Sequence, residues 1–97
     1  MTHMKIVMYS TGACPFCMMA RQLLETKGVD YEEIRVDKEA GARQQMERVS
    51  GRHTVPQIFI GERHVGGFDE LQALERDGEL DALLVDVPGA RTAGGDN

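Results

Sequence analysis

Residues 6–17 read Ile-Val-Met-Tyr-Ser-Thr-Gly-Ala-Cys-Pro-Phe-Cys: an apolar run, a short loop and both cysteines of the chain, two residues apart. A Cys-x-x-Cys pair that opens a helix after a strand is typical of a thiol–disulfide redox site. The free N–H groups and the macrodipole at the helix start favour a thiolate at Cys14, and Pro15 suits the first helical turn. Cys17 lies one turn further and is expected to be more buried. We therefore predict that Cys14 is the attacking thiol and Cys17 the resolving thiol.

Two other uses of this cysteine pair are less favoured. Zinc usually needs four protein ligands, but the chain has no further cysteine, and the three histidines lack the close spacing of a ligand pair (His3, His53 and His64). A structural disulfide across so short a loop would constrain the unfolded chain little. Two cysteines also do not make the disulfide framework of a secreted protein. No metal site is predicted.

The composition indicates one small globular domain. The chain has 97 residues, of which 41% are hydrophobic and 28% charged, enough for a single core. Its net charge of −5 argues against nucleic acid or an anionic membrane as the main partner. No apolar run reaches transmembrane length, and the one that follows residues 1–5 is too short for a signal peptide. We expect a cytoplasmic monomer.

Two strand–helix units are predicted before residue 52. A strand over residues 5–9 leads to a helix that begins at Pro15 and ends at Lys27-Gly28. Its apolar side chains recur at helical spacing: Phe16, Met19, Ala20, Leu23 and Leu24. A second strand over 31–36 places Ile34 and Val36 on one face. Asp37 is a candidate N-cap for a second helix that ends at Ser50-Gly51. The apolar stripe of that helix is Ala42, Met46 and Val49.

The second half predicts a hairpin and two helices. Strands over 57–60 and 63–65 flank Gly61-Glu62, which suits a two-residue turn with glycine first. Asp69 with Gln72 resembles a capping box that opens a third helix. Asp77-Gly78 interrupts the helical pattern, and a short helix is predicted over 80–84. The predicted domain is 1–85, and the polar, glycine-rich residues 86–97 are expected to be a disordered tail.

The predicted order of elements is β-α-β-α-β-β-α plus a short C-terminal helix. The first two strands must be parallel, because a right-handed helical crossover joins them, and the last two form an antiparallel hairpin. A four-stranded mixed sheet with helices on both faces accommodates this order. The fold class is therefore α/β.

Three motifs in this order point to a known family: Cys14-Pro15-Phe16-Cys17, Thr54-Val55-Pro56 and Gly66-Gly67-Phe68-Asp69. Together with the order of elements, they make the chain from Lys5 to about Leu84 resemble a glutaredoxin. It is most similar to the small bacterial dithiol kind. The resemblance implies a thioredoxin-like fold that lacks the first strand and helix of thioredoxin.

The resemblance also implies a glutathione site beside the first cysteine. A cis Val55–Pro56 bond would turn the Val55 backbone toward Cys14, so that glutathione pairs with it as a short added strand. At the third helix, the N–H groups of Phe68 and Asp69 would hold the γ-glutamyl carboxylate, and the Asp69 side chain would hold the α-amino group. The other implied glutathione-binding residues are Thr11, Phe16, Arg43, Thr54, Pro56 and Gly67.

At two of these positions, residues 43 and 11, the charge of the side chain matters for glutathione binding. Arg43, on the exposed side of the second predicted helix, stands where the family carries glutamine or arginine to hold the glycine carboxylate of glutathione, and a guanidinium can do so in bidentate fashion. Thr11 stands where many glutaredoxins carry a lysine, three residues before the first cysteine. Its presence suggests weaker glutathione capture or a less acidic Cys14. The remaining arginines near these motifs are interpreted as solvated charges: Arg21, Arg48 and Arg52.

The predicted function is glutathione-dependent thiol–disulfide oxidoreduction. Cys14 alone would reduce glutathione mixed disulfides, and Cys14 with Cys17 would reduce protein disulfides. The expected partners are glutathione and glutathionylated or disulfide-containing proteins. One alternative is a dimer that carries a glutathione-ligated [2Fe–2S] cluster, which Pro15 and Cys17 disfavour. Another is an electron donor reduced by thioredoxin reductase, which Arg43 and Asp69 disfavour.

Overall fold

The computed structural model describes residues 5–85 and residue 87. The elements follow the predicted order, with the short helix at the end: β1 (Ile6–Ser10), α1 (Pro15–Thr26), β2 (Tyr31–Arg35), α2 (Ala42–Ser50), β3 (Gln57–Ile60), β4 (Arg63–Gly66), α3 (Phe68–Arg76) and α4 (Leu80–Leu84). The first strand begins and ends one residue later than predicted. The α/β fold class is confirmed.

The four strands form one mixed sheet in the order β2-β1-β3-β4. β1 pairs with β2 in parallel, as the helical crossover between them requires. β3 pairs with both β1 and β4 in antiparallel fashion. The chain therefore leaves the central strand β1 directly into the loop that carries the cysteines.

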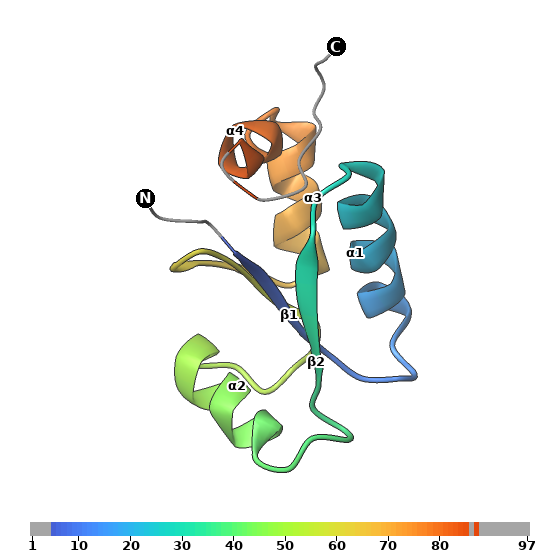
Figure 1. The fold of residues 1–97 in the computed structure, drawn as a ribbon, viewed down its shortest axis with the longest axis vertical. Coiled ribbons are helices and arrows are strands. Elements are labelled where there is room, and N and C mark those ends of the chain that lie inside the picture. Colours follow the sequence, from blue (N-terminus) through green and yellow to red (C-terminus); the bar gives the residue numbers. More distant parts are fainter. Residues whose placement is uncertain (1–4, 86, 88–97) are drawn as a thin grey trace.

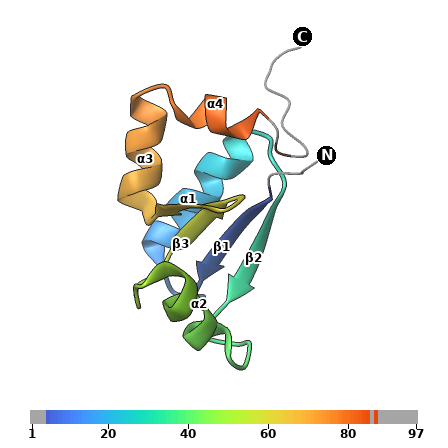
Figure 2. The same ribbon diagram turned by 90° about the vertical axis from the view of Figure 1, so that its left-hand side faces the viewer.

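Two hydrophobic clusters cover the two faces of the sheet, as the alternation of side chains along a strand requires. Ile6 and Met8 point into the larger cluster, which α1, α3 and α4 cover, whereas Tyr9 points into the smaller cluster, which α2 covers. Figures 1 and 2 show α2 on the opposite side of the sheet from α1 and α3. The prediction of helices on both faces is confirmed.

The helix that follows the cysteines buries a narrower stripe than its sequence predicts. Ala20 and Leu24 are fully buried with Cys17, but Met19 is 42% exposed and Phe16 is 55% exposed. Placing Met19 and Phe16 in the core stripe was therefore wrong. The face of α1 that contacts the sheet is set by Cys17, Ala20 and Leu24, at i, i+3 and i+7, so the two larger side chains fall beside it.

The second helix differs from the prediction at its start and in its stripe. Asp37 is not its N-cap, because its carboxylate is bound by the Arg35 guanidinium. The helix begins five residues later, after Gly41, which has a φ of 78° in the left-handed region that glycine favours. Ala42 and Met46 are buried as predicted. Val49 is 48% exposed, because this short helix covers only part of the sheet.

The hairpin is confirmed, and the cap of the third helix is corrected. Gly61 opens the turn with a φ of 61°. The helix α3 begins at Phe68 rather than after Asp69, with Gly67 as the N-cap. The Glu70 carboxylate accepts the Gly67 N–H at 2.8 Å, so Glu70, and not Gln72, completes the capping interaction.

The described chain ends against the main core. Val87 is buried there, beside Leu84. The rest of the predicted tail, residues 86 and 88–97, lies outside the described residues. Of the helices in the described part, none combines the length and the apolar character needed to cross a bilayer.

Candidate active site

The two cysteines occupy different environments at the start of α1. Cys14 is the N-cap in an extended conformation, and the Cys17 N–H donates to its Sγ at 3.0 Å. This contact satisfies one of the N–H groups that a helix start leaves free and would stabilise negative charge on sulfur. Cys14 is partly exposed, whereas Cys17 is fully buried. Their Cα atoms are 5.1 Å apart, and the sulfurs are joined in a disulfide.

The segment before β3 lies against the first cysteine. The Val55–Pro56 peptide bond is cis, as the resemblance implied. The Val55 carbonyl oxygen lies 3.9 Å from the Cys14 Sγ. Val55 is half-buried and Pro56 is buried, while Thr54 is exposed. The backbone of Thr54 and Val55 therefore forms a short edge next to the Cys14 sulfur, and a ligand could pair with it as an added strand.

A hollow of about 220 Å³ opens beside this segment. Phe16 and Phe68 form one wall, with their rings stacked at 6.3 Å between centroids and an interplanar angle of 27°. Seven of the predicted glutathione-binding residues line the hollow: Phe16, Thr54, Val55, Pro56, Gly67, Phe68 and Asp69. The fold thus brings together the turn after Cys14, the segment before β3 and the start of α3.

Three further residues line the hollow, and sequence reasoning did not assign them: Arg52, Gln57 and Glu70. The sequence offered a clue to Gln57, which is a polar residue at the start of an apolar strand. It also offered a clue to Glu70, which lies three residues after a glycine that precedes a helix. No sequence pattern pointed to Arg52, which was interpreted as a solvated charge.

Two of the lining residues form an ion pair. Arg52 Nη1 lies 3.8 Å from Glu70 Oε1, and the same oxygen accepts the Gly67 N–H. That hydrogen bond is the main reason why the pKa of the Glu70 carboxyl is lowered, with a smaller effect from Arg52. Glu70 thus remains charged at neutral pH, next to the first N–H groups of α3.

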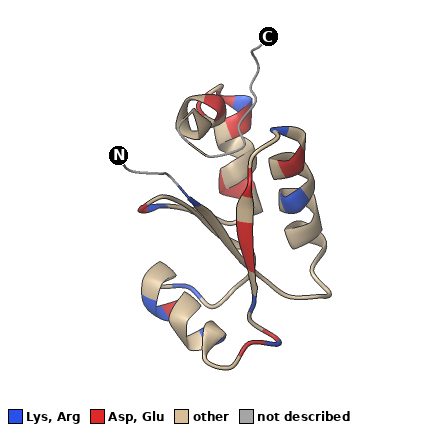
Figure 3. Ribbon diagram, viewed as in Figure 1, with Lys and Arg blue, Asp and Glu red and all other residues tan. Residues whose placement is uncertain are grey.

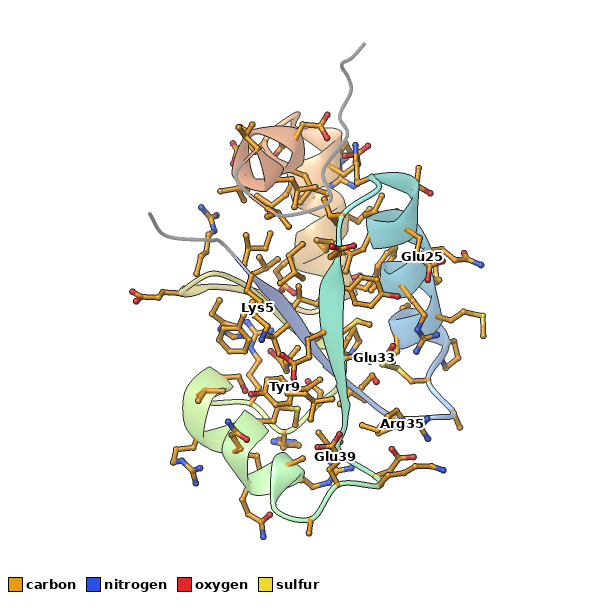
Figure 4. All side chains as sticks on the ribbon, in the orientation of Figure 1. Lys5, Tyr9, Glu25, Glu33, Arg35 and Glu39 are labelled. Carbon is orange, nitrogen blue, oxygen red and sulfur yellow. A yellow bond between two sulfur atoms is a disulfide. The ribbon has the colours of Figure 1, made fainter. Side chains whose placement is uncertain are left out.

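Thr11 lies outside the hollow, in the loop that leads from β1 to Cys14. That loop is tied to the end of β2, because the Gly12 N–H donates to Asp37 at 3.2 Å. Arg35 binds the same carboxylate at 2.8 and 2.9 Å, strongly lowers the pKa of Asp37, and packs against Gly12. Figure 4 shows Arg35 where β2 ends, near this loop. An ion pair of Arg35 with Asp37, and not a free cation, thus stands beside the cysteine loop.

Arg43 is exposed, as predicted, but does not line the hollow beside Cys14. It lines a second hollow of about 320 Å³ at the start of α2, together with residues 36–41 and Gln44. The two hollows share no lining residue. The described structure therefore gathers seven of the nine predicted glutathione contacts, and leaves Thr11 and Arg43 outside that group.

A hydrogen-bonded triad supports α1 from the sheet. Buried Ser10 donates to Glu33 Oε2 at 2.6 Å, and Arg21 binds both oxygens of Glu33 at 2.6 and 3.1 Å. Figure 4 shows Glu33 on β2 beside α1. The hydrogen bond from Arg21 is the main reason why the pKa of Glu33 is lowered. The triad therefore fixes α1, one turn after Cys17, to the adjacent strands β1 and β2.

Replacing this carboxylate is expected to change the acid stability of the fold. The pKa of Glu33 in the folded protein is lower than the unfolded value of about 4.3. The ionised carboxylate therefore stabilises the fold above that pH, and this stabilisation is lost as the pH falls through the folded pKa. Glu33→Gln should therefore flatten the dependence of the unfolding free energy on pH below about 4.3. Urea unfolding at a series of pH values measures this. An equal flattening in Glu32→Gln, on the same strand but paired with Lys5, would assign the effect to overall charge instead.

Charged residues of both signs are interleaved over the described elements (Figure 3). Among residues 5–85 and 87, no group of three or more His, Cys, Asp or Glu side chains is placed to hold a metal ion.

Comparisons with known proteins identify relatives of this chain. A family model for glutaredoxin matches residues 6–65. A glutaredoxin of Pseudomonas aeruginosa is 56% identical over 79 residues, which cover 81% of this chain and 94% of the relative. Glutaredoxin 3 of Escherichia coli is 47% identical over 79 residues, with 81% and 95% covered. The solved buckwheat glutaredoxin–glutathione complex has a TM-score of 0.77 at 31% identity, over 84% of this chain and 76% of that one.

Proposed function

Because this chain belongs to the glutaredoxin family and is a thiol–disulfide oxidoreductase by that membership, we propose that glutathione is its reductant. Cys14 alone reduces glutathione mixed disulfides, and Cys14 with Cys17 reduces protein disulfides. The observation that carries the proposal is the position of Cys14. Its partly exposed sulfur stands between the free end of α1 and the Val55 carbonyl.

The reaction with a glutathione mixed disulfide needs only the first cysteine. The Cys14 thiolate attacks the glutathione sulfur, the substrate thiolate leaves and takes up a proton, and Cys14 becomes glutathionylated. The thiolate of a second glutathione then attacks the bound glutathione sulfur. This step forms glutathione disulfide and releases the Cys14 thiolate. In total, one free glutathione thiol is consumed and one substrate thiol is released, so the disulfide passes from the substrate to glutathione.

A protein disulfide needs both cysteines. Attack by Cys14 forms a mixed disulfide with one substrate sulfur and releases the other as a thiol. The Cys17 thiolate then attacks the Cys14 sulfur, frees the second substrate thiol and forms the Cys14–Cys17 disulfide. Two glutathione molecules reduce that disulfide in turn. The 5.1 Å between the two Cα atoms is compatible with this closure.

The hollow offers a site for the glutathione moiety. Its peptide backbone would pair with the edge at Val55, and its γ-glutamyl carboxylate would meet the N–H groups of Phe68 and Asp69, which have no partner within the first turn of α3. The solved buckwheat relative contains glutathione, which supports this proposal. We further propose a monomer in the cytoplasm, where thiols are kept reduced.

Assays with the two reductase systems test the proposal. NADPH consumption should depend on glutathione and glutathione reductase when a glutathionylated peptide is the substrate. Thioredoxin reductase with NADPH should support little turnover. The reverse preference would refute glutathione as the reductant and would favour an electron donor that thioredoxin reductase serves.

A comparison of two arginines tests where a glutathione carboxylate binds. Arg52 lines the hollow, whereas Arg43 lines the separate one at α2. We expect Arg52→Ala to raise the KM for a glutathionylated peptide about fivefold, which corresponds to about 1 kcal/mol for an exposed charged contact. The kcat should change little, because a bond to a remote carboxylate is made equally in the ground and transition states.

Arg43→Ala serves as the matched variant, since it removes the same charge from another exposed position. Its KM should rise less than that of Arg52→Ala. A larger rise in Arg43→Ala would assign the carboxylate to Arg43, as the family resemblance implied, and would remove Arg52 from the site.

A further inference from the structure

A buried amide stands behind the segment that faces Cys14. Gln57 is the first residue of β3, and its side chain is only 1% exposed. Its Nε2 donates to the Thr54 carbonyl oxygen at 3.1 Å and lies 3.3 Å from Thr54 Oγ1. A carbonyl oxygen can only accept, so the NH₂ group must face Thr54. The Oε1 atom of Gln57 must therefore find its own donor inside the protein.

That donor is His64 on β4. Its Nε2 lies 2.7 Å from Gln57 Oε1, and because Oε1 can only accept, Nε2 must carry the proton. The imidazole ring stacks on Phe59 with centroids 4.7 Å apart and an interplanar angle of 24°. The hydrogen bonds thus run in one direction, from His64 to Gln57 and from Gln57 to Thr54.

The chain of hydrogen bonds ends at a segment without regular secondary structure. Residues 52–56 belong to no helix or strand, and Thr54 is exposed. The next residue, Val55, places its carbonyl oxygen 3.9 Å from the Cys14 Sγ. A loop whose backbone is held before binding loses less conformational entropy when a ligand pairs with it. The sheet, through β3 and β4, therefore holds the edge beside the cysteine.

We propose that His64 and Gln57 are positioning residues that hold the Thr54–Val55 edge ready for the glutathione moiety. The inference rests on the proposed function. Among the described residues, the side-chain hydrogen bonds of Gln57 and His64 go to each other and to Thr54 and not to a cysteine, so the two residues should act on substrate capture and not on the sulfur chemistry. We call the hydrogen bonds from His64 to Gln57 and from Gln57 to Thr54 the relay. Its loss should raise the KM for a glutathionylated peptide about fivefold, with little change in kcat or in the pKa of the Cys14 thiol.

His64→Phe is the first variant. It keeps an aromatic ring against Phe59 but removes the donor, so Gln57 Oε1 is left buried and unpaired. We expect a lower melting temperature and a higher KM. His53→Ala is the matched control, because His53 is an exposed histidine of the 52–56 segment that does not line the hollow. It should leave both quantities unchanged.

A double variant separates positioning from stability. In Gln57→Met with His64→Phe, both partners of this hydrogen bond become apolar, so the melting temperature should recover most of the loss. The Thr54 carbonyl oxygen still lacks the hydrogen bond from residue 57, so the KM should stay raised. A KM that returns to the wild-type value together with the melting temperature would overturn the proposal, as would a wild-type KM in His64→Phe.

One further readout does not depend on activity. The Val55 backbone amide signal in the nitrogen–proton NMR spectrum should shift in both variants and should exchange with solvent faster than in the wild-type protein. If wild-type protein shows no glutathione-dependent turnover, the proposed function fails, and this signal still decides whether the relay holds the edge. An unchanged Val55 signal in both variants would refute the relay itself.

Discussion

Cys14→Ser is expected to lower the rate of every disulfide exchange reaction of this protein by more than about a thousandfold. A hydroxyl does not ionise near neutral pH and does not exchange with disulfides. The partly exposed Cys14 at the start of α1 has no substitute, because Cys17, the only other cysteine in the chain, is fully buried. The measurement is turnover of a glutathionylated peptide and of a protein disulfide under the same conditions.

Cys17→Ser is the matched variant and should affect only one of the two reactions. Reduction of the glutathionylated peptide should continue, since that route needs only Cys14. Reduction of the protein disulfide should be lost, because the mixed disulfide has no internal thiol to resolve it. If Cys17→Ser abolishes both reactions while Cys14→Ser retains either, the two cysteines have the opposite roles.

Leu24→Ala is expected to cause the largest loss of stability that we predict. Leu24 is fully buried on α1 in the larger core cluster. Truncating such a side chain removes its transfer free energy and leaves a cavity, which together cost about 2–5 kcal/mol. Urea unfolding of the oxidised protein, with the disulfide kept intact in all variants, measures the change in midpoint.

Met19→Ala is the control on the same helix. The helical spacing of apolar residues placed Met19 in the same stripe as Leu24, but the structure leaves it 42% exposed. Its replacement should change the unfolding free energy by no more than about 0.5 kcal/mol. Equal losses in the two variants would mean that α1 buries the broader face that its sequence pattern predicts.

Much of the candidate site could be predicted because its parts are local motifs. Cys14 and Cys17 owe their different exposure to a helix that begins between them, which Pro15 and the apolar spacing indicate. The segment at Val55 and the start of α3 were also found as short motifs. Their gathering into one hollow was implied only by family resemblance, since no local pattern sets the distance between residue 16 and residue 68.

Charged and polar partners were the harder part. Asp37 has the chemistry of a helix cap, but it binds Arg35 and the Gly12 N–H instead. Arg52 was interpreted as a solvated charge and lies at the hollow beside Glu70. A long charged side chain can pair with groups from several elements, and these alternative ion pairs differ little in free energy. The spacing of residues in the sequence therefore does not predict which pair forms.

The sequence by itself determined the order of the elements, the parallel pairing of β1 with β2 and the cysteine pair at the start of a helix. Each follows from local periodicity, from turn residues or from the handedness of a crossover. Only the tertiary structure decided which side of α1 is buried, which charges pair, and that hydrogen bonds run from His64 through the buried Gln57 to Thr54. The physical reason is that burial and hydrogen bonding depend on contacts between residues far apart in the chain, and the packing of the sheet against its helices creates those contacts.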